Sequence, residues 1–188
     1  ILVSILHVPA GTRRFEDLYN LISRTLNSSR KTANGIYMYD EDTDRENHEH
    51  IKLVMNLKEC VNRSMQGFSV QYQPIVRLTT GLWTGVEALC RWSRPETGPV
   101  SPLVFIHEAE RLGLINELGT WVLDTAVRQT KEIGLDSIDD FFLSVNISPI
   151  QMMDGNFADT VADILKRHDY PGGKLNLEVT ESARMTFS

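Results

Sequence analysis

The chain has 188 residues, of which 41% are hydrophobic and 23% are charged, a balance typical of globular rather than disordered proteins. Its formal net charge of −6 argues against a nucleic-acid polymer as partner, because such polymers select basic surfaces. Its two cysteines form no CxxC pair, which argues against a disulfide framework or a zinc site.

The same features bear on cellular location. Few cysteines without a disulfide pattern favour the reducing cytoplasm. No apolar run reaches the roughly 18 residues of a membrane span, so any membrane anchor would lie in other segments of a longer parent protein. We expect such a parent, because the sequence lacks an initiator Met and stops at Ser188 without a terminal signal.

The front of the chain predicts a small strand–helix–strand unit. Residues 1–8 are apolar, four apolar residues recur at helical spacing between 15 and 26, and a second short strand follows at 35–39. The acidic run 40–46 predicts a solvated linker and a domain boundary. The chain therefore divides into two predicted domains, residues 1–46 and residues 47–188.

The sequence pattern of the second domain predicts strands that alternate with helices. After a helix at 50–65, the predicted strands are 68–76, 82–92, 141–147 and 174–179, and the predicted helices are 102–112, 115–133 and 157–168. Thr80-Gly81 joins the first two strands, and because this connection is too short for a crossover, they should form an antiparallel hairpin. The later strand–helix–strand units predict parallel strands in an α/β fold.

Each predicted strand has one apolar face and one face with polar side chains. The second face carries Gln71 and Gln73; Glu87, Leu89 and Arg91; Ser144, Asn146 and Ser148; and Asn176 and Glu178. In a parallel barrel this face would point inward and line a solvent-accessible site at the carboxyl ends of the strands. The alternative is an antiparallel sheet with one face in water, which the helices between the later strands disfavour.

Two carboxylates and an amide, from Glu87, Asn146 and Glu178, lie near these strand ends. Such oxygen ligands suit Mg²⁺ or Mn²⁺ rather than zinc. Arg91 lies on the same face, and its planar guanidinium could bind a phosphate through two N–H groups. A purely structural cluster is the alternative interpretation. Glu110, on the helix predicted at 102–112, we interpret as a solvated or structural carboxylate.

A series of short motifs follows this pattern in a fixed order. They are Tyr72-Gln73-Pro74-Ile75, Gly85-Val86-Glu87-Ala88-Leu89-Cys90-Arg91-Trp92, Ser101-Pro102, Phe105-Ile106, Glu108-Ala109-Glu110, Gly113-Leu114-Ile115, Trp121-Val122-Leu123, Ser144-Val145-Asn146-Ile147-Ser148-Pro149 and Leu177-Glu178-Val179-Thr180-Glu181-Ser182. On these motifs, residues 68–182 resemble the EAL family of cyclic di-GMP phosphodiesterases. A lone Glu-Ala-Leu would carry no information, but the ordered series is highly specific.

The resemblance implies a modified (β/α)8 TIM-type barrel whose first strand is antiparallel, here present in part and preceded by a small α/β remnant. It implies hydrolysis of cyclic di-GMP to the linear dinucleotide pGpG with Mg²⁺ or Mn²⁺, and a possible homodimer. By position it implies Glu87 as the catalytic residue and metal ligand, Asn146 and Glu178 as further metal ligands, Gln73, Leu89 and Arg91 as substrate contacts, and Glu181 as a residue that steadies a loop near the site.

The family's paired aspartates, its lysine and a later glutamate would all follow Ser188. We therefore expect the 188 residues alone to be inactive. The alternative to an enzyme is a catalytically inactive EAL domain that acts as a cyclic di-GMP receptor or as a protein-interaction module.

Residues 1–39 resemble the last strand–helix–strand of a GGDEF domain, which often precedes an EAL domain. The likeness rests on the layout and on the runs Val3-Ser4-Ile5, Phe15-Glu16-Asp17-Leu18 and Tyr37-Met38-Tyr39-Asp40. The signature loop that names that family is not in this sequence, so the likeness implies no cyclase activity.

Overall fold

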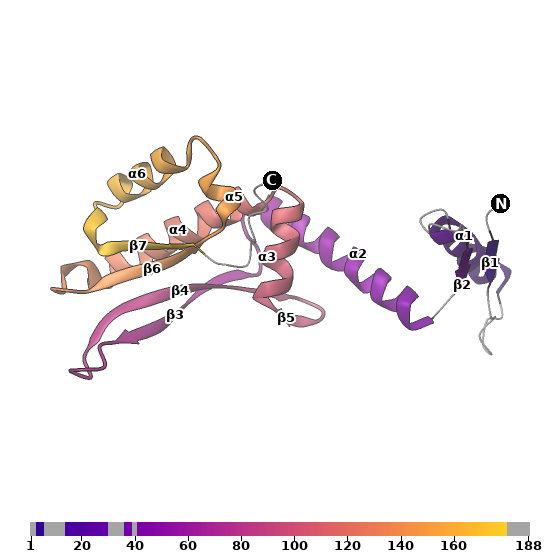
Figure 1. Cartoon of the computed structure of the whole chain (residues 1–188), viewed down its shortest axis with the longest axis horizontal. Coiled ribbons are helices and arrows are strands. Elements are labelled where there is room, and N and C mark those ends of the chain that lie inside the picture. The colour runs from indigo at the N-terminus through magenta and orange to yellow at the C-terminus, as the bar shows by residue number, and fades with distance from the viewer. Residues whose placement is uncertain (1–2, 6–13, 30–35, 39–40, 180–188) are drawn as a thin grey trace. The chain divides into compact units, whose positions relative to one another are not determined.

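The computed structural model describes residues 3–5, 14–29, 36–38 and 41–179, in two compact units that divide between Leu53 and Val54. In the first unit, strands β1 (Val3–Ile5) and β2 (Ile36–Met38) pair in parallel, and helix α1 (Phe15–Ser29) joins them (Figure 1). This arrangement confirms the predicted strand–helix–strand order. The assignment of this unit to a GGDEF domain stays a prediction.

Residues 41–46 of the acidic run are helical, so the helix predicted at 50–65 begins earlier than expected. Helix α2 (Glu41–Asn62) starts within that run. Carboxylates near the beginning of a helix are favoured by its dipole, and the ammonium of Lys52 donates to Glu49 Oε1 at 2.9 Å one turn away. At the other end of α2, Leu57 and Val61 are almost fully buried in the second unit.

The second unit is built on a mixed sheet. Its strands are β3 (Phe68–Val76), β4 (Trp83–Arg94), β5 (Gly98–Val100), β6 (Phe142–Ile147) and β7 (Leu175–Val179). The order is β3-β4-β6-β7, with β5 paired to β4. The β3–β4 pair is antiparallel whereas β4, β6 and β7 run parallel, which confirms the predicted α/β fold with an antiparallel first strand. The short strand β5 was not predicted.

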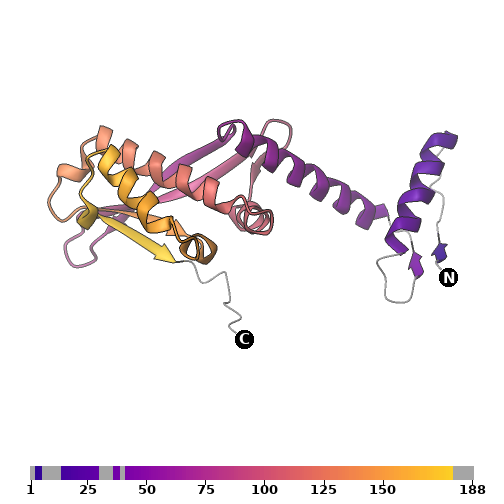
Figure 2. The ribbon, with the colours of Figure 1, turned by 90° about the horizontal axis from the view of Figure 1, so that it is seen from above.

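Helices cover one face of this sheet (Figures 1 and 2). They are α3 (Pro102–Arg111), α4 (Ile115–Glu132), the short α5 (Pro149–Met152) and α6 (Phe157–Arg167). The core beneath them consists of the apolar phase of the strands and one side of α4, with Val86, Ala88, Leu143, Val145, Leu123, Ala126 and Val127 all buried. No helix within the part of the chain described here is long and apolar enough to cross a membrane.

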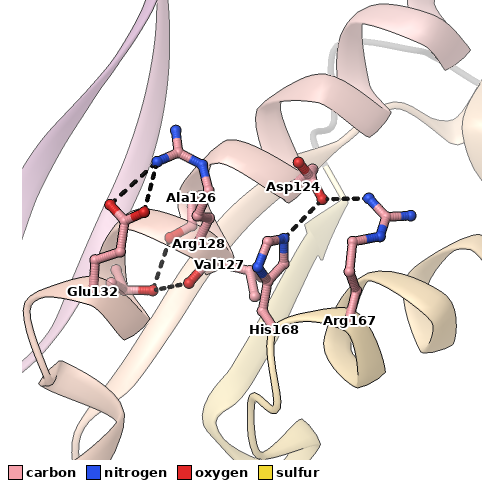
Figure 3. Close-up of polar contacts among 8 residues, drawn as sticks. Asp124, Ala126, Val127, Arg128, Glu132, Arg167 and His168 are labelled. Carbon is pink, nitrogen blue, oxygen red and sulfur yellow. Dashed lines mark hydrogen bonds and ion pairs between the residues drawn. The ribbon is translucent and has the colours of Figure 1, made fainter.

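Polar contacts fasten α6 to α4 on the outer side of the unit. Figure 3 shows His168 and Arg167 both directed toward the carboxylate of Asp124. The distances to Asp124 Oδ1 are 2.9 Å from His168 Nε2 and 2.8 Å from Arg167 Nη1. Because α6 leads into β7, these contacts help to set the position of that strand beside β6.

Candidate active site

The strand register brings the predicted metal ligands together. In the parallel pairing, Glu87 on β4 lies opposite Ser144 on β6, and Asn146 on β6 lies opposite Glu178 on β7. Asn146 Nδ2 donates a hydrogen bond to Glu87 Oε1 at 2.6 Å. Side chains from three adjacent strands therefore converge on the face of the sheet opposite the helices.

Ser144 is a member of this group to which sequence reasoning gave no role. Its side chain is fully buried, and its hydroxyl donates a hydrogen bond to Glu178 Oε1. The signals in the sequence were its place on the polar phase of β6, two residues before Asn146, and its place in the motif 144–149. The contact orients the Glu178 carboxylate from the neighbouring strand.

The predicted substrate contacts lie on the same face. Gln73 on β3 is directly opposite Glu87 in the hairpin, and its side chain is exposed. Arg91 lies further along β4, where its Nε donates to Gln71 Oε1 at 3.2 Å and its Nη1 donates to the carbonyl of Cys90 at 2.9 Å. Gln71 therefore orients Arg91. The sequence could not predict this role, because it depends on which residues of β3 and β4 lie opposite each other.

The donor set fits a hard divalent cation. Two carboxylates and one amide supply oxygen ligands of the kind that Mg²⁺ and Mn²⁺ prefer. Within the described residues, no group of three or more His, Cys, Asp or Glu side chains gathers at one point. Because Mg²⁺ requires octahedral coordination, the three residues would need additional ligands. Glu181, expected to steady a loop near the site, lies outside the described residues.

A cavity of about 440 Å³ adjoins Asn146, Leu89 and Arg91. It lies among the ends of β4 and β6 and the helices α3, α4 and α5, and its lining includes Leu89, Arg91, Ile106, Glu110, Asn146 and Ser148. Apolar walls with a few convergent polar groups are typical of sites for small organic ligands. Leu89 and Arg91, predicted as substrate contacts, thus border a cavity that also reaches Asn146.

Cys90 lines the same cavity from the opposite phase of β4. Burial raises the pKa of its thiol to about 12, an effect that the neighbouring positive charge of Arg91 only partly offsets. The thiol is therefore neutral at physiological pH, and nothing in its surroundings favours the thiolate needed for a nucleophile.

The β6–α5 turn is fixed by a compact hydrogen-bond network. Ser148 Oγ donates to Glu110 Oε1 at 2.7 Å and accepts from the backbone N–H of Ile150 at 3.2 Å. The backbone N–H of Ser148 donates to Gln151 Oε1 at 3.1 Å, which completes a capping box. Of the two interpretations given to Glu110, solvated or structural, its contact with Ser148 supports the structural one.

The EAL domain family model matches residues 58–187, which include all of these site residues. The chain belongs to the EAL domain family. As an EAL domain it is similar to the bifunctional diguanylate cyclase/cyclic di-GMP phosphodiesterase MucR of Pseudomonas aeruginosa, with 34% identity over 93% of this chain and 25% of that protein. This chain spans about a quarter of the length of the first three curated relatives that it matches.

Solved EAL domains have the same fold. The PaMucR phosphodiesterase in complex with c-di-GMP is 38% identical, with a TM-score of 0.64 over 72% of this chain and 54% of that one. The EAL enzyme Bd1971, bound to cAMP and cyclic di-GMP, is 28% identical, with a TM-score of 0.65 over 90% of this chain and 45% of that one. The mixed sheet of the second unit therefore corresponds to part of the EAL (β/α)8 barrel.

Proposed function

We propose that this EAL domain, as part of its full-length protein, hydrolyses cyclic di-GMP to pGpG with Mg²⁺ or Mn²⁺. The observation that carries the proposal is the convergence of Glu87, Asn146 and Glu178 on one face of the sheet, with Asn146 Nδ2 at 2.6 Å from Glu87 Oε1. The names of similar proteins support the substrate, since MucR is a cyclic di-GMP phosphodiesterase.

Each residue has a distinct task in this proposal. The oxygens of Glu87, Asn146 and Glu178 would hold the divalent ion. When bound, this ion would neutralise the negative charge that develops on the phosphoryl group. Arg91 would hold a phosphate, because its guanidinium has five N–H donors and the contacts of Nε and Nη1 leave others available. Leu89 and the cavity beside it would accept an apolar face of the ligand.

Hydrolysis can be tested with the longest available form of the protein. Wild type with Mg²⁺ or Mn²⁺ should convert cyclic di-GMP to pGpG, detected by chromatography, and Glu87→Gln should lower turnover by at least about a hundredfold. Glu132→Gln is the matched control, because it removes only an exposed ion pair with Arg128 at the end of α4 (Figure 3). Near-normal hydrolysis by Glu87→Gln would overturn the assignment.

Binding without hydrolysis would point instead to a receptor. A wild-type protein that binds cyclic di-GMP tightly but yields no pGpG with either ion would contradict the enzymatic proposal. Absence of both binding and hydrolysis would leave a role in protein interaction. Cytoplasmic location is part of the proposal, supported by the free thiols of Cys60 and Cys90. Homodimer formation stays a prediction.

A further inference from the structure

Glu110 differs in its contacts from Glu108, the other acidic residue of its helix. Glu108, also on α3, receives two hydrogen bonds from Arg111, at 2.9 and 2.6 Å. Glu110 instead lines the cavity, where it accepts the hydrogen bond of the Ser148 hydroxyl. This contact joins α3, which follows β4 and β5 in the chain, to the end of β6.

Ser148 can direct its single proton to only one acceptor. That proton goes to the carboxylate of Glu110, so the oxygen lone pairs face the N–H of Ile150. A hydrogen bond to a charged acceptor is about twice as strong as a neutral one, and Ser148 is only 5% exposed. Removal of Glu110 would leave a buried hydroxyl free to rotate, and the cap on α5 would weaken.

The same turn is held from its other side by steric fit. Gln151 is only 3% exposed, and its amide lies so close to Gly119 on α4 that a Cβ at this glycine would overlap it. Gln151 in turn accepts the backbone N–H of Ser148. The turn is therefore clamped between α3 and α4, and it begins two residues after Asn146.

We propose that Glu110 is a positioning residue for Asn146. By accepting the proton of Ser148 it fixes the β6–α5 turn, and this turn sets the end of β6 and the direction of the Asn146 amide toward Glu87. The inference rests on the proposed function, because Asn146 matters as a ligand of the divalent ion. Residues that orient a metal ligand without contacting the ion themselves typically change metal affinity by about 10- to 100-fold when they are mutated.

The experiment uses the longest available form of the protein and four variants: Glu110→Ala, Glu110→Gln, Ser148→Ala and the double variant Glu110→Ala/Ser148→Ala. Mn²⁺ affinity is measured by electron paramagnetic resonance without substrate, and kcat and KM are measured with cyclic di-GMP. Each alanine variant should weaken Mn²⁺ binding and lower kcat by about tenfold, with little change in KM. Glu110→Gln, which keeps an oxygen acceptor, should retain most of both quantities.

The double variant decides whether Glu110 acts through Ser148. If Glu110 acts through Ser148, the double variant should lose no more Mn²⁺ affinity or kcat than either single variant. Additive losses of these quantities would overturn the proposal. A rise in KM with unchanged kcat and Mn²⁺ affinity would also overturn it, because Glu110 would then contact the ligand itself. If Glu110→Ala fails to fold, Ser148→Ala carries the test, and unchanged Mn²⁺ affinity and kcat in that variant would refute the proposal.

Failure of the proposed function is distinguishable from failure of this inference. A wild-type protein with neither Mn²⁺ binding nor hydrolysis would overturn both. A wild-type protein with both properties, together with a folded Glu110→Ala variant that keeps them, would overturn only the role of Glu110.

Discussion

Asn146 on β6 donates a hydrogen bond to Glu87 on β4, although the two residues are separated by 59 positions in the sequence. The contact depends on the parallel pairing of β4 with β6, which places Asn146 one polar-phase position beyond the partner of Glu87. Both side chains therefore belong to one site, and substitutions at either should affect the same proposed ion.

Replacement of Asn146 by Asp should make the stability of the unit depend on metal. The variant loses the N–H donor and places a second carboxylate next to Glu87, so without metal we expect a loss of about 1–3 kcal/mol. Thermal unfolding in EDTA should then show a lower midpoint than wild type. Added Mn²⁺ should raise the midpoint of the variant more than that of wild type, because the site carries one more negative charge.

Asn47→Asp is the control for this comparison, since Asn47 is exposed on α2. Its midpoint should respond to Mn²⁺ as wild type does. An Asn146→Asp variant that is as stable as wild type in EDTA and gains no more from Mn²⁺ would show that the site does not bind the ion.

Replacement of Ser144 by Ala should weaken the ion site without unfolding the protein. The buried hydroxyl donates to Glu178, and its loss leaves that carboxylate without a fixed orientation. We expect Mn²⁺ affinity to fall by about tenfold, measured by calorimetric titration. Ser93→Ala, at an exposed position of β4, should have no such effect, and an equal loss in both variants would contradict the role assigned to Ser144.

A methyl group at position 119 should be incompatible with the clamp on the β6–α5 turn. Gly119→Ala would overlap the amide of Gln151, and overpacking of this kind costs about 1–3 kcal/mol. Chemical denaturation should reveal the loss. The double variant Gly119→Ala/Gln151→Ala should be more stable than the sum of the single effects predicts, and simple additivity would show that the two residues do not compete for space.

Cys90 should be unreactive in the folded protein. Its pKa of about 12, compared with an ordinary value of 9.0, makes the thiolate fraction at pH 8 about a thousandfold smaller than in the unfolded chain. In a Cys60→Ser variant, alkylation by iodoacetamide followed by mass spectrometry should therefore be slow until denaturant is added. Equally fast alkylation of the folded and unfolded forms would contradict the burial of this thiol.

The same shift has a consequence for stability. Because the folded state keeps the Cys90 proton while the unfolded state loses it above about pH 9, this group lowers stability as the pH rises from about 9 to 12. The stability of Cys90→Ser should decline less steeply over this range than that of wild type. Parallel declines in urea denaturation would argue against the raised pKa.

Local patterns in the sequence were sufficient for most of the fold and for the shared face of the three proposed metal ligands. The turn at Thr80-Gly81 predicted the hairpin, and alternation along the strands predicted that Glu87, Asn146 and Glu178 share a face. The start of α2 was missed because a run of acidic residues favours both a solvated linker and the first turn of a helix.

The supporting contacts could not be predicted in the same way. The pairs Ser144–Glu178, Arg91–Gln71 and Ser148–Glu110 join elements 20 to 38 positions apart. Each depends on strand register or on how a helix packs, and small polar side chains such as serine leave no periodic signal. Only the three-dimensional arrangement identifies which of several carboxylates a given hydroxyl meets.

Anomalous diffraction from crystals of the longest available form of the protein, grown with Mn²⁺, would show whether Glu87, Asn146 and Glu178 hold a divalent ion. We predict a manganese peak at ligating distance from the side-chain oxygens of these three residues. A manganese peak elsewhere, in crystals of a protein that hydrolyses cyclic di-GMP, would contradict the assignment of these three residues as its metal ligands.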